Sequence, residues 1–232
     1  MLRNHRRTFV HAALLLAGMV AVFAAVGRHP PSAAPQTTVP FVGEWDQSVY
    51  RAMDDIRTAV LTGIARALNV LGGGVVTIPL RSVVAAWLAL HRRWRAFAAW
   101  ALTWVGAELL LTLAKTFFHR GRPPNALVVT VGYSFPSGHA VAGASIAVAL
   151  VLVLMDPGPR RRAWEWAAVA FAFVMALSRV YLNAHWFSDV VAGVLLGAGV
   201  ALGSAALVTE IREHAFRGID AHLGRRDDGP AP

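Results

Sequence analysis

The sequence predicts an all-α protein, an integral-membrane six-helix bundle, from its composition, its apolar windows and its arginine pattern. Of 232 residues, 56% are hydrophobic and only 15% are charged, and mean hydropathy is +0.50. This composition is typical of membrane proteins. Six mostly apolar windows approach the roughly 20 residues that cross a bilayer as a helix. The windows are 8–27, 73–90, 97–117, 138–155, 164–183 and 188–208, and Arg81 interrupts the second.

Arginines gather on one side of the membrane if every window spans it. Because basic loops stay in the cytoplasm, both termini are expected there, and the segments 28–72, 118–137 and 184–187 are expected outside. The net charge of +9 is then a topology signal for a multi-pass cell-membrane protein with lipid neighbours, and no nucleic-acid partner is predicted. The four arginine groups are Arg3, Arg6 and Arg7; Arg92, Arg93 and Arg95; Arg160, Arg161 and Arg162; and Arg212, Arg217, Arg225 and Arg226.

The elements are expected in the following order. Residues 1–27 form a first span with a basic cytoplasmic start, and a cleaved signal peptide is the alternative. Residues 28–72 form an extracytoplasmic segment, a proline-rich linker followed by an amphipathic helix or helical hairpin over 44–71, whose apolar residues recur every three or four positions. Residues 73–209 form the transmembrane bundle with the chemistry described below, and 210–232 form a cytoplasmic tail.

Three polar clusters stand where apolar windows end. The first contains Lys115, the only lysine in the chain, and Arg122-Pro123. Ammonium and guanidinium differ in contact geometry, so a lone lysine among arginines is notable. Between these two cations, His119 and Arg120 are expected to be solvated loop residues.

The second cluster is Pro136-Ser137-Gly138-His139, at the start of the fourth window. A proline suits the first turn of a helix, where backbone N–H groups lack internal partners and the helix dipole favours anions. Ser137 and Gly138 are therefore candidates for binding an anion, and His139 can donate a proton near neutral pH.

The third cluster contains Ser178-Arg179, His185 and Asp189. If residues 185–189 are helical, His185 and Asp189 share one face, and the carboxylate can hold one imidazole N–H so that the other nitrogen presents its lone pair. Three cations, two histidines and one carboxylate are suited to binding a phosphoryl group and breaking its ester bond.

Together these clusters resemble, residue for residue, the signature of the type 2 phosphatidic acid phosphatase superfamily, over residues 115–189. The resemblance implies a helical-bundle core and a membrane hydrolase of phosphoric or diphosphoric esters acting on lipid phosphates. Isoprenoid diphosphate, phosphatidic acid and phosphatidylglycerophosphate are the implied substrate classes. The resemblance makes no prediction of oligomeric state.

The resemblance also implies roles. His185 is the nucleophile that forms a phosphohistidine, Asp189 orients it, and His139 protonates the leaving oxygen and later activates water. The residues that it implies for phosphate binding are Lys115, Arg122, Arg179, Ser137 and Gly138.

No cofactor and no metal are predicted, because the remaining outer acids are scattered along residues 44–55. A lipid phosphotransferase that uses the same residues is one alternative, and a non-catalytic lipid-phosphate transporter or scaffold is another. Within the bundle, Arg81 and Glu108 are expected at similar depth and are interpreted as an ion pair, because unpaired charges are costly in lipid; contact with a substrate channel is the alternative.

Overall fold

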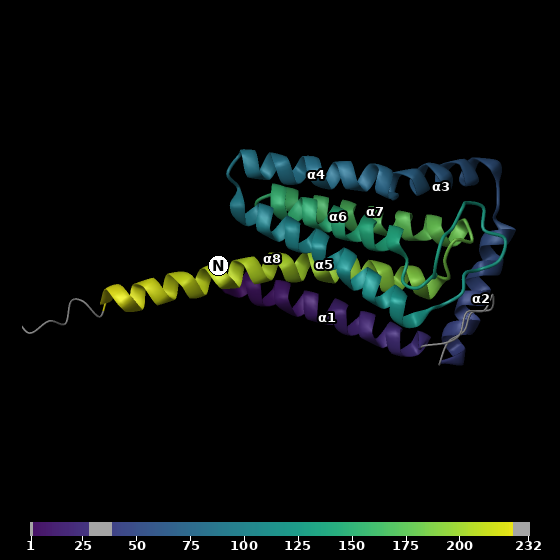
Figure 1. Cartoon of the computed structure of the whole chain (residues 1–232), viewed down its shortest axis with the longest axis horizontal. Helices are drawn as coiled ribbons and strands as arrows, with labels where there is room; N and C mark the ends of the chain where they lie inside the picture. The colour runs from purple at the N-terminus through teal and green to yellow at the C-terminus, as the bar shows by residue number, and fades with distance from the viewer. Residues whose placement is uncertain (1, 28–38, 225–232) are drawn as a thin grey trace, which may run out of the picture.

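The computed structural model describes residues 2–27 and 39–224, and these residues form helices joined by short connections, with no strand among them. The expected linker falls mostly on residues 28–38 and the end of the expected tail on 225–232, which both lie outside the described residues. The all-α prediction is confirmed for the described residues. The helices, drawn in Figure 1, are α1 (Leu2–Val26), α2 (Pro40–Asp55), α3 (Ala59–Leu71), α4 (Gly74–Leu90), α5 (Trp94–Phe118), α6 (Gly138–Leu154), α7 (Pro159–Tyr181) and α8 (Phe187–Gly224).

Among the described residues, four helices are long and apolar enough to cross a membrane: α1, α5, α7 and the Phe187–Ile211 part of α8. The other two predicted windows coincide with α4 and α6, which have 17 residues each. At 1.5 Å per residue such a helix covers about 26 Å, slightly less than the hydrocarbon layer. Helices α3 and α4 are long and apolar enough to cross a membrane only when they are taken together as one segment, and that segment is bent by 47° between them. A multi-pass membrane protein is thus confirmed, and the six-span count stays a prediction.

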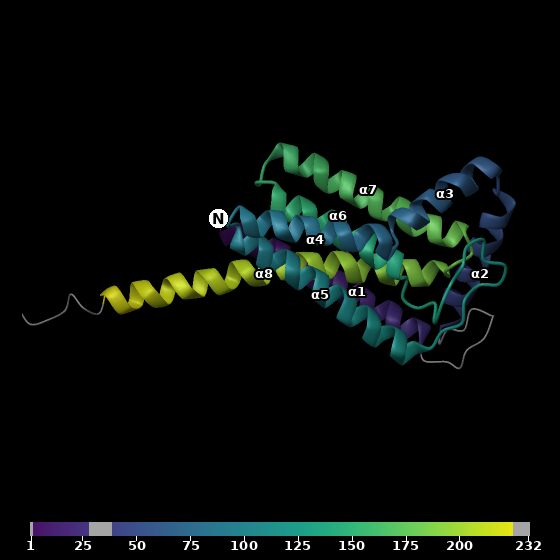
Figure 2. The same ribbon diagram turned by 45° about the horizontal axis from the view of Figure 1, so that its top comes forward.

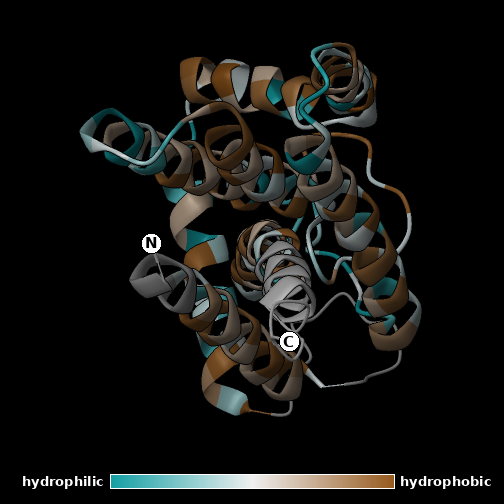
Figure 3. Ribbon diagram, turned by 90° about the vertical axis from the view of Figure 1, so that its left-hand side faces the viewer, coloured by the Kyte–Doolittle hydropathy of each residue, from teal (hydrophilic) through white to brown (hydrophobic). Residues whose placement is uncertain are grey.

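Helix α8 is the centre of the bundle and packs against α1, α2, α5, α6 and α7 (Figure 3). Where α8 packs against α6, the backbones of the two helices are in close contact. A Cβ atom on Gly193 would lie 2.8 Å from the Ser137 carbonyl oxygen, and one on Gly197 would lie 2.4 Å from that of Val141. Glycine at these two positions therefore allows the start of α6 to lie beside the start of α8.

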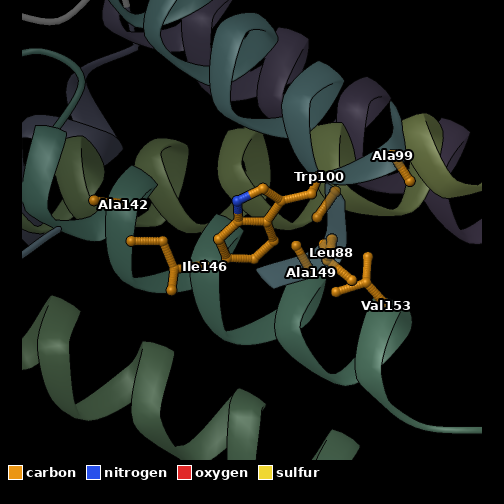
Figure 4. Packing of buried hydrophobic residues seen from close by; sticks show 8 residues of the cluster. Leu88, Ala99, Trp100, Ala142, Ile146, Ala149 and Val153 are labelled. Carbon is orange, nitrogen blue, oxygen red and sulfur yellow. The ribbon is translucent and has the colours of Figure 1, made fainter. Parts of the chain in front are cut away.

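Away from that contact, a hydrophobic cluster joins α4, α5, α6 and α8 around the Trp100 indole (Figure 4). The indole Nε1 donates to the Arg81 carbonyl oxygen at 3.0 Å, so this large buried ring leaves no polar group unpaired. The cluster packs these four helices together in the part of the bundle away from the polar connections. Its buried members are Leu88, Ala99, Trp100, Ala142, Ile146, Ala149, Val153 and Ala201.

The amphipathic segment predicted over 44–71 is helical but is broken into α2 and α3 around Ile56–Thr58. The Thr58 hydroxyl oxygen accepts from the Leu61 N–H at 3.2 Å and begins α3 as an N-cap. Helix α2 lies across the end of the bundle where α5 and α7 end and α8 begins (Figures 1 and 2). The first polar connection (residues 119–137) and the turn at residues 182–186 are at that same end.

Within the bundle, Arg81 of α4 and Glu108 of α5 form the ion pair that the sequence suggested. The Arg81 side chain is 3% exposed and the Glu108 side chain is 49% exposed. Arg81 also lies 5.7 Å from the centre of the Trp104 ring. The buried guanidinium therefore depends on one partly exposed carboxylate for charge compensation.

We expect Glu108→Ala to destabilise the protein, because it leaves the Arg81 charge buried without its carboxylate. The expected loss is up to about 3 kcal/mol, at the lower end for a buried pair because Glu108 is partly exposed. Adding Arg81→Leu should restore most of the thermal unfolding midpoint measured in detergent. A double variant that is as unstable as Glu108→Ala would show that the stability lost in Glu108→Ala does not come from the unpaired Arg81 charge.

Candidate active site

The candidate site is built where the connection between α5 and α6 contacts the turn between α7 and α8. The Leu127 N–H donates to the Leu182 carbonyl oxygen at 2.9 Å, and Arg122 Nη1 donates to the Ala184 carbonyl oxygen at 2.7 Å. These bonds tie the first sequence cluster to the third. The second cluster joins them through Ser137, whose N–H donates to the Asp189 carbonyl oxygen at 3.0 Å.

Arg122 and Lys115 converge on one backbone carbonyl. Lys115 Nζ donates to the Tyr133 carbonyl oxygen at 2.6 Å, and Arg122 Nη2 donates to the same oxygen at 3.1 Å. Arg122 also donates to the carbonyl oxygens of Val131 and Gly132, each at 2.9 Å. The guanidinium is thus fixed by backbone acceptors, while the ammonium, with three donors and one acceptor among the described residues, keeps capacity for an anion.

The His185 imidazole lies between Arg122 and Asp189. Its Nε2 is 3.2 Å from Arg122 Nη1, and its Nδ1 is 3.5 Å from Asp189 Oδ2. The side chain is only 4% exposed. The two residues are therefore close, but Nδ1 is at the edge of hydrogen-bond reach and has no hydrogen-bond partner among the described residues.

The physical reason for that pairing differs from the one expected. His185 lies in the turn before α8, which begins at Phe187, so the two residues do not share a helix face. Asp189 instead sits in the first helical turn, and its Oδ2 accepts from the Trp186 N–H at 2.9 Å. This is the carboxylate half of a capping box, and it turns the Asp189 side chain back toward His185.

The electrostatics keep His185 neutral. Burial lowers the pKa of His185 to about 3, the nearby Arg122 and Lys115 act in the same direction, and Asp189 opposes them. A neutral imidazole with Nδ1–H toward Asp189 presents the Nε2 lone pair beside the Arg122 guanidinium. That arrangement fits a nitrogen nucleophile next to a phosphate-binding cation.

Ser137 and Gly138 stand at the start of α6, where the first backbone N–H groups of the helix lack internal partners. The Ser137 hydroxyl is buried, and it has no hydrogen-bond partner among the described residues. An unpaired buried hydroxyl beside a helix N-terminus suits an anionic ligand. A Cβ atom on Gly138 would meet only Leu111 at 3.5 Å, so packing within the described chain does not itself require glycine there.

His139 and Arg179 meet at a residue that the sequence did not single out, Asn69 of α3. His139 Nε2 is 3.0 Å from the Asn69 carbonyl oxygen, and Arg179 Nη1 donates to Asn69 Oδ1 at 2.6 Å. Arg179 is 2% exposed, and its Nε has no partner among the described residues. The site residues thus form two groups, one around His185 and one around Asn69.

Arg120 contradicts the expectation of a solvated loop residue. Its side chain is 1% exposed, and it bridges two buried carboxylates. Nη1 donates to Asp189 Oδ1 at 2.5 Å, and Nη2 donates to Asp46 Oδ2 at 2.6 Å. The expectation was wrong because two carboxylates cannot stay ionised in a buried site without a shared cation.

Asp46 also differs from its expectation. The sequence placed it among scattered outer acids, but it is buried and bonded to Arg120 and Ser188. Its Oδ1 accepts from the Ser188 N–H and its Oδ2 from the Ser188 hydroxyl, both at 2.7 Å. Asp46 of α2 therefore caps the first turn of α8. The signal for it in the sequence was its spacing, because Asp46 precedes Val49 and Met53 by three and seven residues on the apolar face of α2.

The Asp46–Arg120–Asp189 group also has a defined charge state. Burial would lower the pKa of Arg120, but Asp189 and Asp46 more than offset it and raise the value. Burial raises the pKa of Asp46, and Arg120 opposes that shift. Arg120 therefore stays charged, and the network carries one cation between two acids.

The donor set does not point to a metal centre. Among the described residues no group of three or more His, Asp or Glu side chains is placed to hold a metal ion. Both carboxylates of the site are already engaged by Arg120. The prediction that the chemistry needs no metal and no cofactor stays a prediction.

We expect Arg120→Ala to lower stability by about 3–5 kcal/mol, because it leaves two buried carboxylates without their cation. Asp46→Ala should lower stability by less, because Arg120 keeps Asp189 as its partner. The loss of unfolding free energy in the double variant should be smaller than the sum of the two single losses by at least about 1 kcal/mol, because the pair acts as a unit. Thermal and denaturant unfolding in detergent measure both quantities. Asp55→Asn, at an exposed acid of the same helix, is the control, and strict additivity would contradict the bridge.

Comparisons with known proteins agree with this geometry. A family model described as the PAP2 superfamily matches residues 96–213. Phosphatidylglycerophosphatase B of Bacillus subtilis (strain 168) is 27% identical over 166 residues, which cover 66% of this chain and 77% of that protein.

Two crystal structures share the fold. That of the first transmembrane PAP2 type phosphatidylglycerolphosphate phosphatase from Bacillus subtilis has a TM-score of 0.70 at 25% identity, covering 88% of this chain and 96% of that one. That of Aquifex aeolicus LpxE has a TM-score of 0.57 at 25% identity, covering 68% of this chain and 93% of that one. Because the family model spans half of the chain and includes all three polar clusters, the chain belongs to the PAP2 superfamily, which confirms the predicted family and its class of membrane phosphatase.

Proposed function

We propose that this protein hydrolyses lipid phosphate esters in the membrane through a phosphohistidine on His185. The observation that carries the proposal is the buried His185 imidazole, whose Nε2 lies 3.2 Å from Arg122 Nη1 and whose Nδ1 lies 3.5 Å from Asp189 Oδ2. Nucleophile, orienter and cation are the parts that phosphoryl transfer needs, since it depends on positioning and charge stabilisation.

In this proposal the phosphoryl group binds among Lys115, Arg122 and Arg179. Their positive charges attract a phosphate dianion. Lys115 Nζ and Arg179 Nε keep N–H donors for its oxygens, whereas Arg122, fixed by backbone acceptors, contributes mainly its charge. The Ser137 hydroxyl, which has no partner among the described residues, and the Gly138 N–H at the start of α6 complete the set of donors. Both carboxylates near this set are paired with Arg120, which leaves the positive charges of the set available to an anionic ligand.

The first chemical step forms the phosphoenzyme. The Nε2 lone pair of His185 attacks phosphorus as the bond from phosphorus to the ester oxygen breaks, and the bonding electrons leave with that oxygen. Protonated His139 gives its proton to the oxygen, so that an alcohol departs instead of an alkoxide. Asp189 accepts a hydrogen bond from Nδ1–H and stabilises the cationic phosphohistidine.

The second step returns the enzyme to its starting state. His139, now neutral, takes a proton from a water molecule as the water oxygen attacks phosphorus. The bond between phosphorus and Nε2 breaks, and its electrons return to His185. Inorganic phosphate leaves and His139 is again protonated. Each atom and proton is accounted for without a metal ion.

Similarity favours phosphatidylglycerophosphate as the first substrate to test. One relative and one solved structure of similar fold carry that activity in their names. Phosphatidic acid and isoprenoid diphosphate present the same phosphoryl group on an apolar tail, so they belong in the same test. A phosphotransferase would use the same residues and differ only in the acceptor.

We also propose that the site faces the extracytoplasmic side and that both termini are cytoplasmic. Support comes from the arrangement of the ends of the helices. The site segments lie at the end of the bundle that α2 crosses, and α1 begins at the other end (Figure 1). The arginine-rich α4–α5 turn and the start of α7 also lie at that other end, which the positive-inside rule assigns to the cytoplasm.

The proposed hydrolysis predicts release of inorganic phosphate from a lipid phosphate in detergent, in the presence of EDTA and without an acceptor lipid. The panel compares phosphatidylglycerophosphate, phosphatidic acid and isoprenoid diphosphate. His185→Ala should lower turnover by at least about a thousandfold, whereas His91→Ala, at the opposite end of the bundle, should not. Turnover that requires added Mg²⁺, or that survives in His185→Ala, would contradict the proposal.

The pH dependence follows from the lowered pKa of His185. With that pKa at about 3, the nucleophile stays deprotonated when the pH falls from about 8 to about 5. The acid limb of kcat/KM should therefore follow the second ionisation of the substrate phosphate. Its midpoint pH should differ between an alkyl phosphate and an aryl phosphate. A limb fixed near the ordinary histidine pKa of about 6.5 for both substrates would contradict a desolvated nucleophile.

A further inference from the structure

The last turn of α3 contacts both His139 and Arg179. It contributes the Asn69 carbonyl to His139, the Asn69 amide to Arg179, and Gly72 against the His139 ring. We propose that this turn is a positioning element of the reaction, which fixes His139 as the leaving-group acid and Arg179 as a phosphate ligand. The inference rests on the proposed function and adds residues that the three sequence clusters do not contain.

The Asn69 carbonyl is suited to this role because it lies at a helix end. The last carbonyls of a helix lack internal partners, and in α3 the Leu68 and Val70 carbonyls accept from the N–H groups of Gly72 and Gly73. The Asn69 carbonyl between them is 3.0 Å from His139 Nε2. A carbonyl only accepts, so Nε2 carries the proton in this contact.

This contact assigns the reacting atom of His139. With Nε2–H committed to Asn69, the other ring nitrogen, Nδ1, is the atom that gives a proton to the ester oxygen and later takes one from water. The Asn69 carbonyl accepts from Nε2–H in both charge states of the ring, so it fixes the orientation of His139 throughout the reaction. The α3 turn therefore does for His139 what Asp189 does for His185.

The Asn69 side chain orients the second group. Its Oδ1 accepts from Arg179 Nη1 at 2.6 Å, which fixes one edge of the guanidinium. Arg179 Nε has no partner among the described residues. A neutral amide acceptor orients the guanidinium without cancelling its charge, whereas a carboxylate at this position would compete with phosphate.

Gly72 provides the space for the contact. A Cβ atom there would lie 2.8 Å from His139 Cδ2 and 2.8 Å from Met175 Sδ. Its backbone, at φ −84° and ψ −4°, is one that alanine adopts without strain. Gly72→Ala therefore tests close approach to His139 and not backbone conformation. Gly63, in the same helix, has nothing within 4 Å of its Cβ position, so Gly63→Ala is the matched control.

The experiment separates acid catalysis from general damage by the leaving group. Dioctanoyl phosphatidic acid releases an alkoxide oxygen that needs a proton, whereas 4-nitrophenyl phosphate releases a stable phenolate. We expect Gly72→Ala to lower kcat/KM, which reports formation of the phosphoenzyme and not its hydrolysis, at least about tenfold for the lipid and less than about threefold for the aryl ester, since acid catalysis contributes a factor of roughly 100 or more. Gly63→Ala should match the wild type on both.

Asn69→Ala provides a second, independent readout. It removes the Arg179 contact and leaves the backbone carbonyl, so KM should rise by a similar factor for both substrates, with the ratio of their kcat values unchanged. This variant removes only the side-chain contact between Asn69 and Arg179. Thermal unfolding in detergent checks that both variants are folded.

Three results would overturn the inference: equal loss on both substrates in Gly72→Ala, no loss on either, or no rise of KM in Asn69→Ala. Failure of the proposed function itself looks different. In that case the wild-type protein would release no phosphate from the lipid, or His185→Ala would release it at the wild-type rate.

Discussion

The Arg120 guanidinium bridges the carboxylates of Asp46 and Asp189, and the placement of His185, the proposed nucleophile, depends on that bridge. Both acids and the arginine are almost completely buried, where an unpaired charge would cost several kcal/mol. The bridge lets Asp189 remain ionised at the start of α8, so that it can both cap the helix and face His185. It also joins α2, the connection after α5, and α8, which are far apart in the sequence. The same charge balance that stabilises this end of the bundle therefore orients the residue that we propose as nucleophile.

Helices α2 and α3 do more than the amphipathic pattern indicated. Helix α2 reaches the nucleophile side through Asp46 and Arg120, and α3 reaches the leaving-group side through Asn69. The segment over residues 40–71 thus contacts both groups of residues in the candidate site. A surface segment needs only apolar and polar faces, but this one places a buried acid and a helix C-terminus at defined positions.

The parts of the fold and site that the sequence predicted are those with local signals. Apolar windows located α1, α4, α5, α6, α7 and α8, because burial in a membrane needs long apolar runs. The clusters around Lys115, Ser137 and His185 were recognisable because their residue types and spacing are specific. Contacts that depend on packing between distant helices were not predictable in this way. Asn69 is an ordinary polar residue in an amphipathic helix until α3 lies beside α6 and α7, and Arg120 looked solvated because its partners are 74 and 69 residues away.

The most direct test of the account is to trap the phosphoenzyme. In a rapid-quench experiment with a lipid phosphate labelled in its phosphoryl group, the enzyme should carry an acid-labile, base-stable phosphoryl group. Peptide mapping should place it on His185, and the label should disappear when the intermediate is allowed to react with water. A phosphoryl group on another residue, or inversion of configuration at phosphorus during hydrolysis, would contradict a double displacement through His185.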